Sequence, residues 1–251
     1  MIDLDAYCHR IEYTGPRAPT LAALRGLHRA HLRAVPFENL DIHLGRRITL
    51  DEAALFDKIV TRRRGGFCYE QNGLFAAALR ALGFDVSLLE ARVSRKDGTF
   101  GIPFDHLTLV VQLDERWLAD VGFGDSFMLP LRLDDPGEQV QDGARFRVTH
   151  DGVTGIYARQ KAGTWTGEYQ FFLKPRQLDD FAGGCEYHQA SPLSSFTRDR
   201  VCSRATPEGR ITVSDRRLIV TRNGQRTERD LPDEAAFHAA LRDHFGIVFD
   251  A

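Results

Sequence analysis

The sequence predicts an α+β protein in which helices and strands occupy separate parts of the chain. Up to Gly83 the apolar residues recur every three or four positions, which is the spacing of an amphipathic helix. After Gly83 they alternate with polar residues, which is typical of half-buried strands. The last part mixes short strands with one closing helix. We therefore expect a helical section over residues 1–83, a β section over 84–189 and a mixed section over 190–251.

The helical section contains residues that can cap the first turn of a helix. Each of these residues precedes an apolar run. The candidates are Asp3 or Asp5 for the first helix, Thr20 for the second, and Thr49 or Asp51 for the third. Pro36 ends the second of these helices because its ring cannot extend a helix. Residues 36–42 have an apolar spacing that predicts an irregular loop packed on the core. A last helix is expected to begin near Cys68 and to end at Gly83, a common C-terminal cap.

The β section contains runs of alternating or β-branched residues separated by turn signals. We expect strands at 86–93, 106–113, 116–124, 145–149, 155–160 and 165–173. Consecutive short strands with tight turns indicate a small antiparallel barrel or sandwich. In the mixed section we expect strands at 210–213 and 217–221, a hairpin at Asn223-Gly224, and a helix over 233–245.

Composition and charge exclude several classes of protein. The chain of 251 residues is 43% hydrophobic and 27% charged, as soluble globular proteins are. Its net charge of −2 gives no overall field that would attract nucleic acid or an anionic membrane. No apolar run reaches the length of a membrane span, and the N-terminus lacks the features of a signal peptide. We therefore expect a cytoplasmic protein without nucleic-acid or membrane partners.

The four cysteines are far apart and form no CxxC pair, which indicates neither a disulfide framework nor a metal site. One of them, Cys68, stands at the expected start of a helix in the stretch Arg64-Gly65-Gly66-Phe67-Cys68-Tyr69-Glu70. The two glycines are poor helix formers, so the helix begins after them. A helix N-terminus carries a partial positive charge, which favours the thiolate, the nucleophilic form of cysteine. A buried structural cysteine fits the same local pattern.

A nucleophilic cysteine needs a base and a third group that orients the base. His106 opens an apolar strand after a loop with glycine and proline, and Asp120 interrupts an apolar run. A carboxylate in such a run is costly to bury without a partner. Taken singly, His106 could instead face water, and Asp120 could cap a turn through its own backbone.

The hairpin between His106 and Asp120 decides whether the two side chains can meet. A two-residue turn at Asp114-Glu115 would place them on opposite faces of the sheet. A three-residue loop over 113–115 would instead pair Thr108 with Asp120 and make His106 a diagonal neighbour of the acid. We therefore predict an odd-length loop or a bulge in this hairpin.

These three residues together would perform acyl transfer. His106 would take the thiol proton and stabilise the thiolate of Cys68 by charge, while Asp120 would fix the tautomer of the ring. The thiolate would attack an acyl carbon and form a thioester, which can pass its acyl group to an amine or to water. The chain order of cysteine, histidine and aspartate is compatible with papain-like and transglutaminase-like enzymes, so a cysteine hydrolase is an alternative.

Five stretches of the sequence resemble the arylamine N-acetyltransferase family, in the order of that family and over most of the chain. They are Val35-Pro36-Phe37-Glu38-Asn39-Leu40, the cysteine stretch, Asp105-His106-Leu107-Thr108-Leu109, Asp120-Val121-Gly122-Phe123-Gly124, and Phe196-Thr197 followed by Val201-Cys202-Ser203-Arg204. The resemblance implies an N-terminal helical bundle, a central antiparallel β-barrel and a C-terminal α/β lid, with a core like that of cysteine proteases and transglutaminases. It also implies a catalytic triad of Cys68, His106 and Asp120.

The resemblance further implies the reaction and its partners. Acetyl-CoA would acetylate Cys68, coenzyme A would leave, and an arylamine, arylhydrazine or N-hydroxyarylamine would take the acetyl group in a ping-pong mechanism without a metal. The residues implied to line the acceptor pocket are Phe37, Val93, Phe123 and Phe196. Those implied to lie near the coenzyme A pyrophosphate are Gly122, Phe123 and Gly124, and those implied to support the site are Glu38 and Arg64.

Two residues depart from the pattern of the family. Asp125 stands where many relatives carry glycine or a basic residue, and an acid there disfavours a nearby pyrophosphate unless it points away. Asp105 stands where a neutral residue is common, and it would favour the charged form of His106 if it faced the ring. The segment after Pro232 is short beside some relatives.

The alternatives to an acetyltransferase are an amide synthase of the same family that releases a polyketide chain, and a non-catalytic binding module in which Cys68 is buried.

Overall fold

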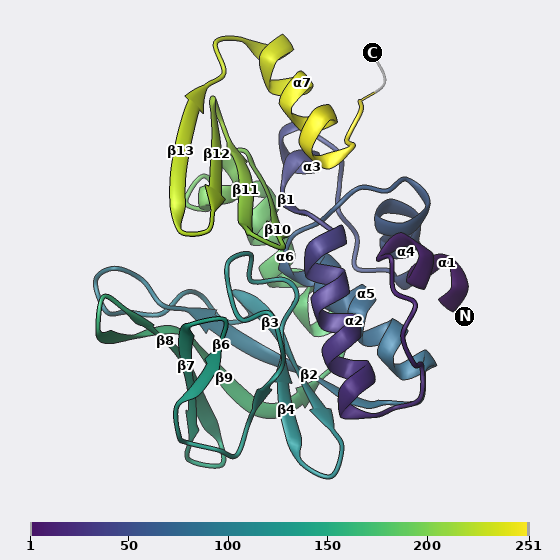
Figure 1. Ribbon diagram of the computed structural model, residues 1–251, viewed down its shortest axis with the longest axis vertical. Helices are drawn as coiled ribbons and strands as arrows, with labels where there is room; N and C mark the ends of the chain where they lie inside the picture. The colour runs from purple at the N-terminus through teal and green to yellow at the C-terminus, as the bar shows by residue number, and fades with distance from the viewer. Residues whose placement is uncertain (1, 250–251) are drawn as a thin grey trace.

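The computed structural model describes residues 2–249 and contains a helical bundle, a barrel-like sheet and a smaller lid sheet (Figure 1). The bundle consists of α1 (Leu4–Arg10), α2 (Leu21–Ala34), α4 (Glu52–Phe56), a π-helical turn at Asp57–Thr61, and α5 (Cys68–Ala81). Helix α5 is buried along most of its length because it lies between the other helices and the first strands of the barrel. No helix in the described part of the chain has the length and hydropathy needed to cross a membrane.

The predicted caps of the first helices are confirmed. The side chains of Asp3, Thr20 and Asp51 accept backbone N–H groups in the first turns of α1, α2 and α4. Each helix therefore begins where the sequence places a side-chain oxygen before an apolar run.

Residues 36–42 do not form the expected loop. They form strand β1 (Phe37–Glu38) and the short helix α3 (Leu40–His43). Strand β1 pairs with β10 (Val201–Thr206), with Phe37 opposite Ser203. This partner lies so far along the chain that the local apolar spacing carries no signal for the pairing.

The predicted antiparallel barrel is confirmed as a nearly closed sheet of eight strands, in the order β5-β4-β3-β2-β9-β8-β7-β6. The strands are β2 (Asp85–Val93), β3 (His106–Gln112), β4 (Arg116–Ala119), β5 (Leu131–Arg132), β6 (Gln139–Gln141), β7 (Ala144–His150), β8 (Thr154–Lys161) and β9 (Thr164–Arg176). Their inward side chains form a core that includes Phe146, Tyr157, Tyr169 and Phe171, and Phe127 from the segment between β4 and β5 packs into it.

A glutamine side chain joins the two edge strands of this sheet. The amide of Gln139 in β6 accepts the backbone N–H of Arg132 in β5 at 2.8 Å and donates to the carbonyl of the same residue at 2.9 Å. An amide group presents the same donor and acceptor as a peptide unit. The side chain therefore replaces one pair of ladder hydrogen bonds between β5 and β6.

The hairpin of β3 and β4 has the predicted odd-length loop. Gln112 pairs with Arg116, so residues 113–115 form a three-residue loop. Leu109 pairs with Ala119, which puts Asp120 opposite Thr108, just beyond the end of β4. The expected strand over 116–124 is too long, because Asp120 ends the ladder with its own hydrogen bonds. The N–H of Gly122 bonds to the Asp120 carboxylate at 3.0 Å instead of to a neighbouring strand.

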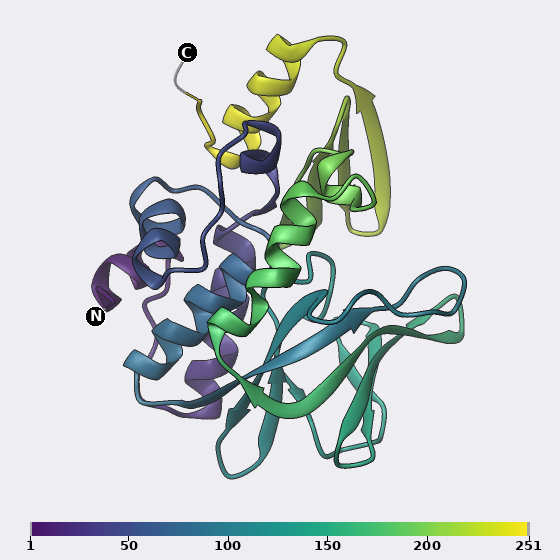
Figure 2. The same ribbon diagram turned by 180° about the vertical axis from the view of Figure 1, so that it is seen from behind.

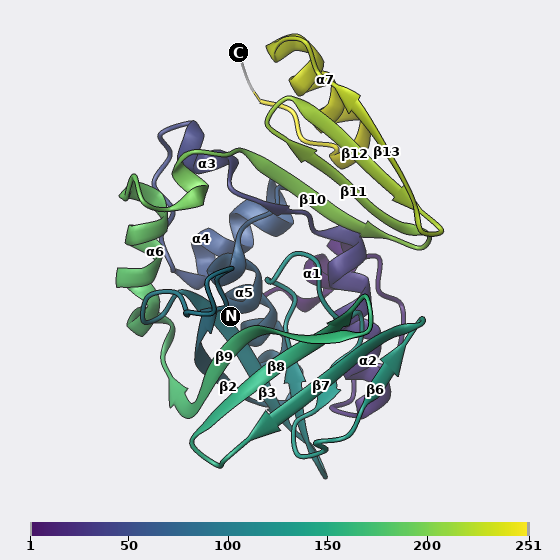
Figure 3. The ribbon, with the colours of Figure 1, turned by 90° about the vertical axis from the view of Figure 1, so that its left-hand side faces the viewer.

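The lid is a second antiparallel sheet, in the order β1-β10-β11-β12-β13, covered by helix α7 (Glu234–Phe245) (Figure 3). Its further strands are β11 (Gly209–Ser214), β12 (Arg217–Arg222) and β13 (Gln225–Asp230). Helix α6 (Ala182–Ala190) leads from the barrel toward the lid (Figure 2). The predicted hairpin at Asn223-Gly224 is confirmed, since Arg222 in β12 pairs with Gln225 in β13. The sequence analysis missed α6 and β10, and α6 contains a glycine pair that obscures its apolar pattern.

Candidate active site

Cys68 is the first residue of α5, as predicted from the two glycines before it. A Cβ atom on Gly65 would lie 2.0 Å from the carbonyl oxygen of Pro36, and one on Gly66 would lie 2.7 Å from Cβ of Glu70. Both positions therefore need glycine for the chain to enter the helix along this path. The Glu70 carboxylate accepts the N–H of Phe67 at 3.1 Å and completes the cap of the helix that carries Cys68.

His106 and Asp120 meet as the hairpin register requires. His106 Nε2 lies 2.7 Å from Asp120 Oδ2, and both side chains are buried. The other carboxylate oxygen of Asp120 accepts the side-chain amide of Asn72 at 2.9 Å and the N–H of Gly122 at 3.0 Å. Burial raises the pKa of Asp120, but the charge of His106 and these hydrogen bonds outweigh it, so the pKa lies below its ordinary value. Asp120 is therefore an ionised partner for the ring.

A second histidine holds the backbone of Asp120. The N–H of Asp120 donates to His28 Nε2 at 3.1 Å, so His28 carries its proton on Nδ1, which donates to the carbonyl of Met128 at 3.0 Å. Burial lowers the pKa of His28 to about 4, which keeps the ring neutral. The sequence analysis gave no signal that His28 belongs to the site.

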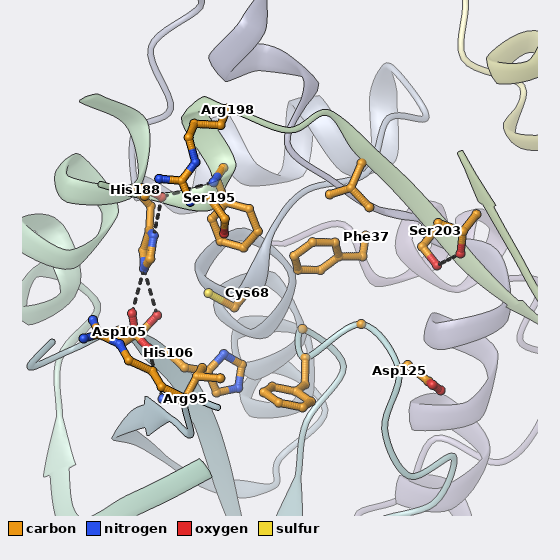
Figure 4. Close-up of a pocket in the computed structure, with 18 of the residues that line it drawn as sticks. Phe37, Cys68, Arg95, Asp105, His106, Asp125, His188, Ser195, Arg198 and Ser203 are labelled. Atoms are coloured by element: carbon orange, nitrogen blue, oxygen red, sulfur yellow. Dashed lines mark hydrogen bonds and ion pairs between the residues drawn. The ribbon is translucent and has the colours of Figure 1, made fainter. Parts of the chain in front are cut away.

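Cys68 and His106 both line one cavity of about 730 Å³ between the bundle, the barrel and the lid (Figure 4). Gly122 packs directly against the cysteine, because a Cβ atom there would lie 2.7 Å from Cα of Cys68. The cavity therefore contains the thiol and the imidazole together, with the turn after Asp120 pressed against the start of α5.

The electrostatic environment of Cys68 has two opposing parts. Burial raises the pKa of its thiol well above the ordinary value, a bond from the backbone of Leu107 lowers it, and the carboxylates of Asp105 and Asp120 raise it further. The partial charge of the helix N-terminus favours the thiolate. Among the causes that shift this pKa burial is the largest, and a nearby cation such as an imidazolium would oppose it.

The four residues implied to line an acceptor pocket all line this cavity: Phe37, Val93, Phe123 and Phe196. The rings of Phe37 and Phe196 lie 5.9 Å apart, although they come from β1 and from the short turn Ser195–Thr197. The ring of Phe123 lies edge-on to His106 at 5.3 Å. The wall around the imidazole is therefore flat and apolar, which suits an aromatic ring.

The glycine turn after Asp120 also lies in the cavity. Gly124 has φ +89, a conformation that favours glycine. The N–H of Gly122 is used by Asp120, whereas those of Phe123 and Gly124 have no hydrogen-bond partner among residues 2–249. Two N–H groups of the turn are thus available to an anion.

Asp125 and Asp105, the two residues that depart from the family pattern, each form ion pairs or hydrogen bonds with other residues. Asp125 forms ion pairs with Arg159 at 3.3 Å and Arg210 at 3.5 Å, so its charge is compensated. The Asp105 carboxylate accepts the N–H of Val93 at 3.0 Å and contacts His188 at 3.1 Å instead of facing His106.

Behind Cys68 lies a buried group of charges that the sequence analysis recognised only in part. Arg64 donates to Glu38 at 2.7 and 3.0 Å, as the resemblance suggested. Lys58 contacts Glu70 at 2.7 Å and Asp41 at 2.8 Å. Burial raises the pKa of Glu70 to about 7, with Lys58 opposing the rise. Lys58 and Asp41 each lie within an apolar run of the sequence. A charged residue in such a run indicates a buried charge with a partner, and nothing else in the sequence indicated their role.

The chain is similar to known acetyltransferases along nearly its whole length. A family model described as N-acetyltransferase matches residues 20–251. The arylamine N-acetyltransferase of Escherichia coli is 35% identical over 98% of this chain and 89% of the relative. The arylamine N-acetyltransferase / N-hydroxyarylamine O-acetyltransferase of Salmonella typhimurium is 37% identical over 97% and 88%. These names favour an arylamine acetyltransferase over the amide synthase, hydrolase and binding-module alternatives.

Solved structures agree with the sequence relatives. The arylamine N-acetyltransferase of Salmonella typhimurium superposes with a TM-score of 0.94 at 36% identity, over 100% of this chain and 94% of that one. The Mycobacterium marinum enzyme in complex with CoA superposes with a TM-score of 0.90 at 34% identity, over 98% and 93%.

Proposed function

Because this chain belongs to the arylamine N-acetyltransferase family and is an acetyltransferase, we propose that it moves an acetyl group from acetyl-CoA to the nitrogen of an arylamine, arylhydrazine or N-hydroxyarylamine through a thioester on Cys68. The observation that carries this mechanism is the 2.7 Å contact of His106 Nε2 with Asp120 Oδ2 beside the cavity that also contains Cys68. An oriented imidazole next to a cysteine is the arrangement that nucleophilic acyl transfer needs.

In the first half-reaction His106 takes the proton of the Cys68 thiol. Asp120 occupies Nε2, so Nδ1 is the nitrogen that accepts this proton. The imidazolium then offsets the burial that otherwise raises the pKa of the thiol. The sulfur attacks the acetyl carbonyl carbon, the carbon–sulfur bond of acetyl-CoA breaks, and coenzyme A leaves with the proton held by His106.

In the second half-reaction the amine nitrogen attacks the thioester carbonyl. His106 accepts the proton that this nitrogen loses and returns it to the sulfur as the carbon–sulfur bond breaks, which regenerates the Cys68 thiol. The aromatic residues Phe37, Phe123 and Phe196 favour an acceptor whose amine is attached to a flat ring.

The donor would be recognised by the glycine turn and the cations of the cavity. The free N–H groups of Phe123 and Gly124 suit a phosphate oxygen, as does positive charge from Arg95, Arg198 and Arg226. The ion pairs of Asp125 with Arg159 and Arg210 remove the main objection to a pyrophosphate there. The CoA complex of the Mycobacterium marinum relative supports acetyl-CoA as the donor.

The test follows coenzyme A release from acetyl-CoA. With the purified protein alone we expect a single turnover, and with an arylamine or hydrazine we expect continuous release together with the acetylated amine. Continuous release without an amine would instead indicate hydrolysis. Absence of any release would contradict acetyl-CoA as the donor.

A further inference from the structure

A second chain of hydrogen bonds joins three side chains that line the same cavity. Asp105 Oδ1 lies 3.1 Å from His188 Nε2, and His188 Nδ1 lies 3.0 Å from Ser194 Oγ. Figure 4 shows His188 directly above Asp105, with Cys68 beside them. These hydrogen bonds link the loop before β3 to helix α6 and to the segment that follows α6.

At each end of this chain of hydrogen bonds, a side chain holds the backbone of an acceptor-pocket residue. The other oxygen of Asp105 accepts the N–H of Val93 at 3.0 Å. Ser194 Oγ accepts the N–H of Phe196 at 3.2 Å, and the ring of Phe196 lies edge-on to His188 at 5.2 Å. Val93 on the barrel and Phe196 next to the lid are therefore joined through three side chains.

Two glycines make room for this arrangement. A Cβ atom on Gly101 would lie 1.9 Å from the Asp105 carboxylate, and one on Gly184 would lie 2.2 Å from the carbonyl oxygen of Phe104. The first keeps space for the acid, and the second lets α6 approach the loop before His106. The Tyr69 hydroxyl donates to the same carbonyl at 2.6 Å, which fixes the loop from the side of α5.

We propose that Asp105, His188 and Ser194 are positioning residues that determine acceptor specificity, because they hold the backbones of Val93 and Phe196, two walls of a slot for a flat aromatic ring. This proposal rests on the proposed function, since it assigns these walls to the second half-reaction. The three residues act on the acceptor through the walls and take no part in proton transfer at Cys68. The acetyl group of acetyl-CoA carries no aromatic ring, so we expect the first half-reaction to depend little on this slot.

The test compares acceptors that differ in their need for the slot. Ser194→Ala leaves the N–H of Phe196 and Nδ1 of His188 without their partner. Asp105→Ala leaves the N–H of Val93 without its partner, and His188 Nε2 keeps only the backbone carbonyl of residue 105 at 3.2 Å. We expect kcat/KM for an aromatic amine to fall roughly ten-fold in each variant, mainly through KM. With hydrazine itself, which has no ring to hold, kcat/KM should stay within about two-fold. The rate of Cys68 acetylation by acetyl-CoA should stay within about the same limit in Ser194→Ala, and it should not fall in Asp105→Ala, which removes a carboxylate that raises the pKa of the Cys68 thiol.

Conservative and control variants separate positioning from general damage. Ser194→Thr keeps the hydroxyl and should restore the low KM for the aromatic amine. Asp97→Ala changes an acid of the same loop that bonds only to Thr99, and it should behave as the unmodified protein does. If Ser194→Ala and Asp105→Ala do not fold, Gly101→Ala provides the same comparison, because it displaces Asp105 without removing it.

If kcat/KM falls equally with the aromatic amine and with hydrazine, or falls with neither, the positioning role is overturned. A slower acetylation of Cys68 in the variants would do the same. Failure of the unmodified protein to be acetylated at Cys68 would instead contradict the proposed function, and this result is read before any variant is compared.

Discussion

His28 on α2 and Asp120 at the end of β4 are joined by a 3.1 Å hydrogen bond from the Asp120 N–H to the neutral ring nitrogen of His28. The acid that orients His106 is thus held by its side chain through His106, Asn72 and Gly122, and by its backbone through the helical bundle. Helix α2 therefore contributes to the geometry of the proposed triad through His28, although it carries none of the three triad residues.

Substitution His28→Leu should lower both stability and the rate of Cys68 acetylation. It leaves the Asp120 N–H and the Met128 carbonyl buried without partners, which costs about 1–3 kcal/mol each in the free energy of unfolding. Urea denaturation and stopped-flow CoA release measure the two effects. His9→Leu on the exposed face of α1 is the control. An acetylation rate unchanged in His28→Leu would mean that Asp120 does not need this support.

The buried His31 should make the protein sensitive to acid. Burial lowers its pKa to about 3, whereas the unfolded chain titrates near the ordinary value of about 6.5. The unfolded state therefore binds more protons below about pH 6.5, so stability falls as the pH falls. The slope from this group reaches about 1.4 kcal/mol per pH unit. We expect His31→Gln to reduce the slope of the unfolding free energy between about pH 6 and 4. An identical slope in both proteins would contradict a neutral buried His31.

Gly122→Ala should disturb Cys68 because the new Cβ would lie 2.7 Å from Cα of Cys68 and from the amide of Asn72. Neither the helix nor the side chain that holds Asp120 has room to move, so we expect a loss of about 1–3 kcal/mol in stability and a larger loss of activity. Gly183→Ala is the matched control, since nothing lies within 4 Å of its Cβ position. Thermal unfolding and CoA release provide the comparison, and equal behaviour of the two variants would contradict the close packing.

Lys58→Met should be strongly destabilising. It removes the cation between Glu70 and Asp41 and leaves both carboxylates buried, which costs about 3–5 kcal/mol. Arg62→Gln breaks the exposed ion pair with Asp57 and should cost less than about 1 kcal/mol. Urea denaturation distinguishes the two. Similar losses in both variants would show that the buried charges do not stabilise the start of α5.

The sequence predicted those parts of the site that depend on local signals. Gly65 and Gly66 fixed the start of α5 at Cys68, and the parity of the hairpin required the loop that brings Asp120 to His106. Both predictions concern residues a few positions apart or strands joined by a short turn. The barrel and the lid followed from the resemblance, and the solved relatives confirm that architecture.

The partners that the sequence could not supply come from distant parts of the chain. His28 and Asp120 are 92 positions apart, and His188 and Asp105 are 83 apart. A single polar residue on an apolar face signals that some partner exists, but the partner's identity depends on the tertiary fold. Strand β1 was missed for the same reason, because its partner strand β10 lies far along the chain.

The mass of the intact protein after incubation with acetyl-CoA and no amine measures whether Cys68 is the nucleophile that His106 activates. We expect one acetyl group per chain, located on the peptide that contains Cys68 and removed when an arylamine is added. In His106→Ala and Asp120→Ala the adduct should form far more slowly, while Cys185→Ala should not change it. An unmodified mass, an acetyl group on Cys8, Cys185 or Cys202, or full turnover by Cys68→Ser would contradict the mechanism.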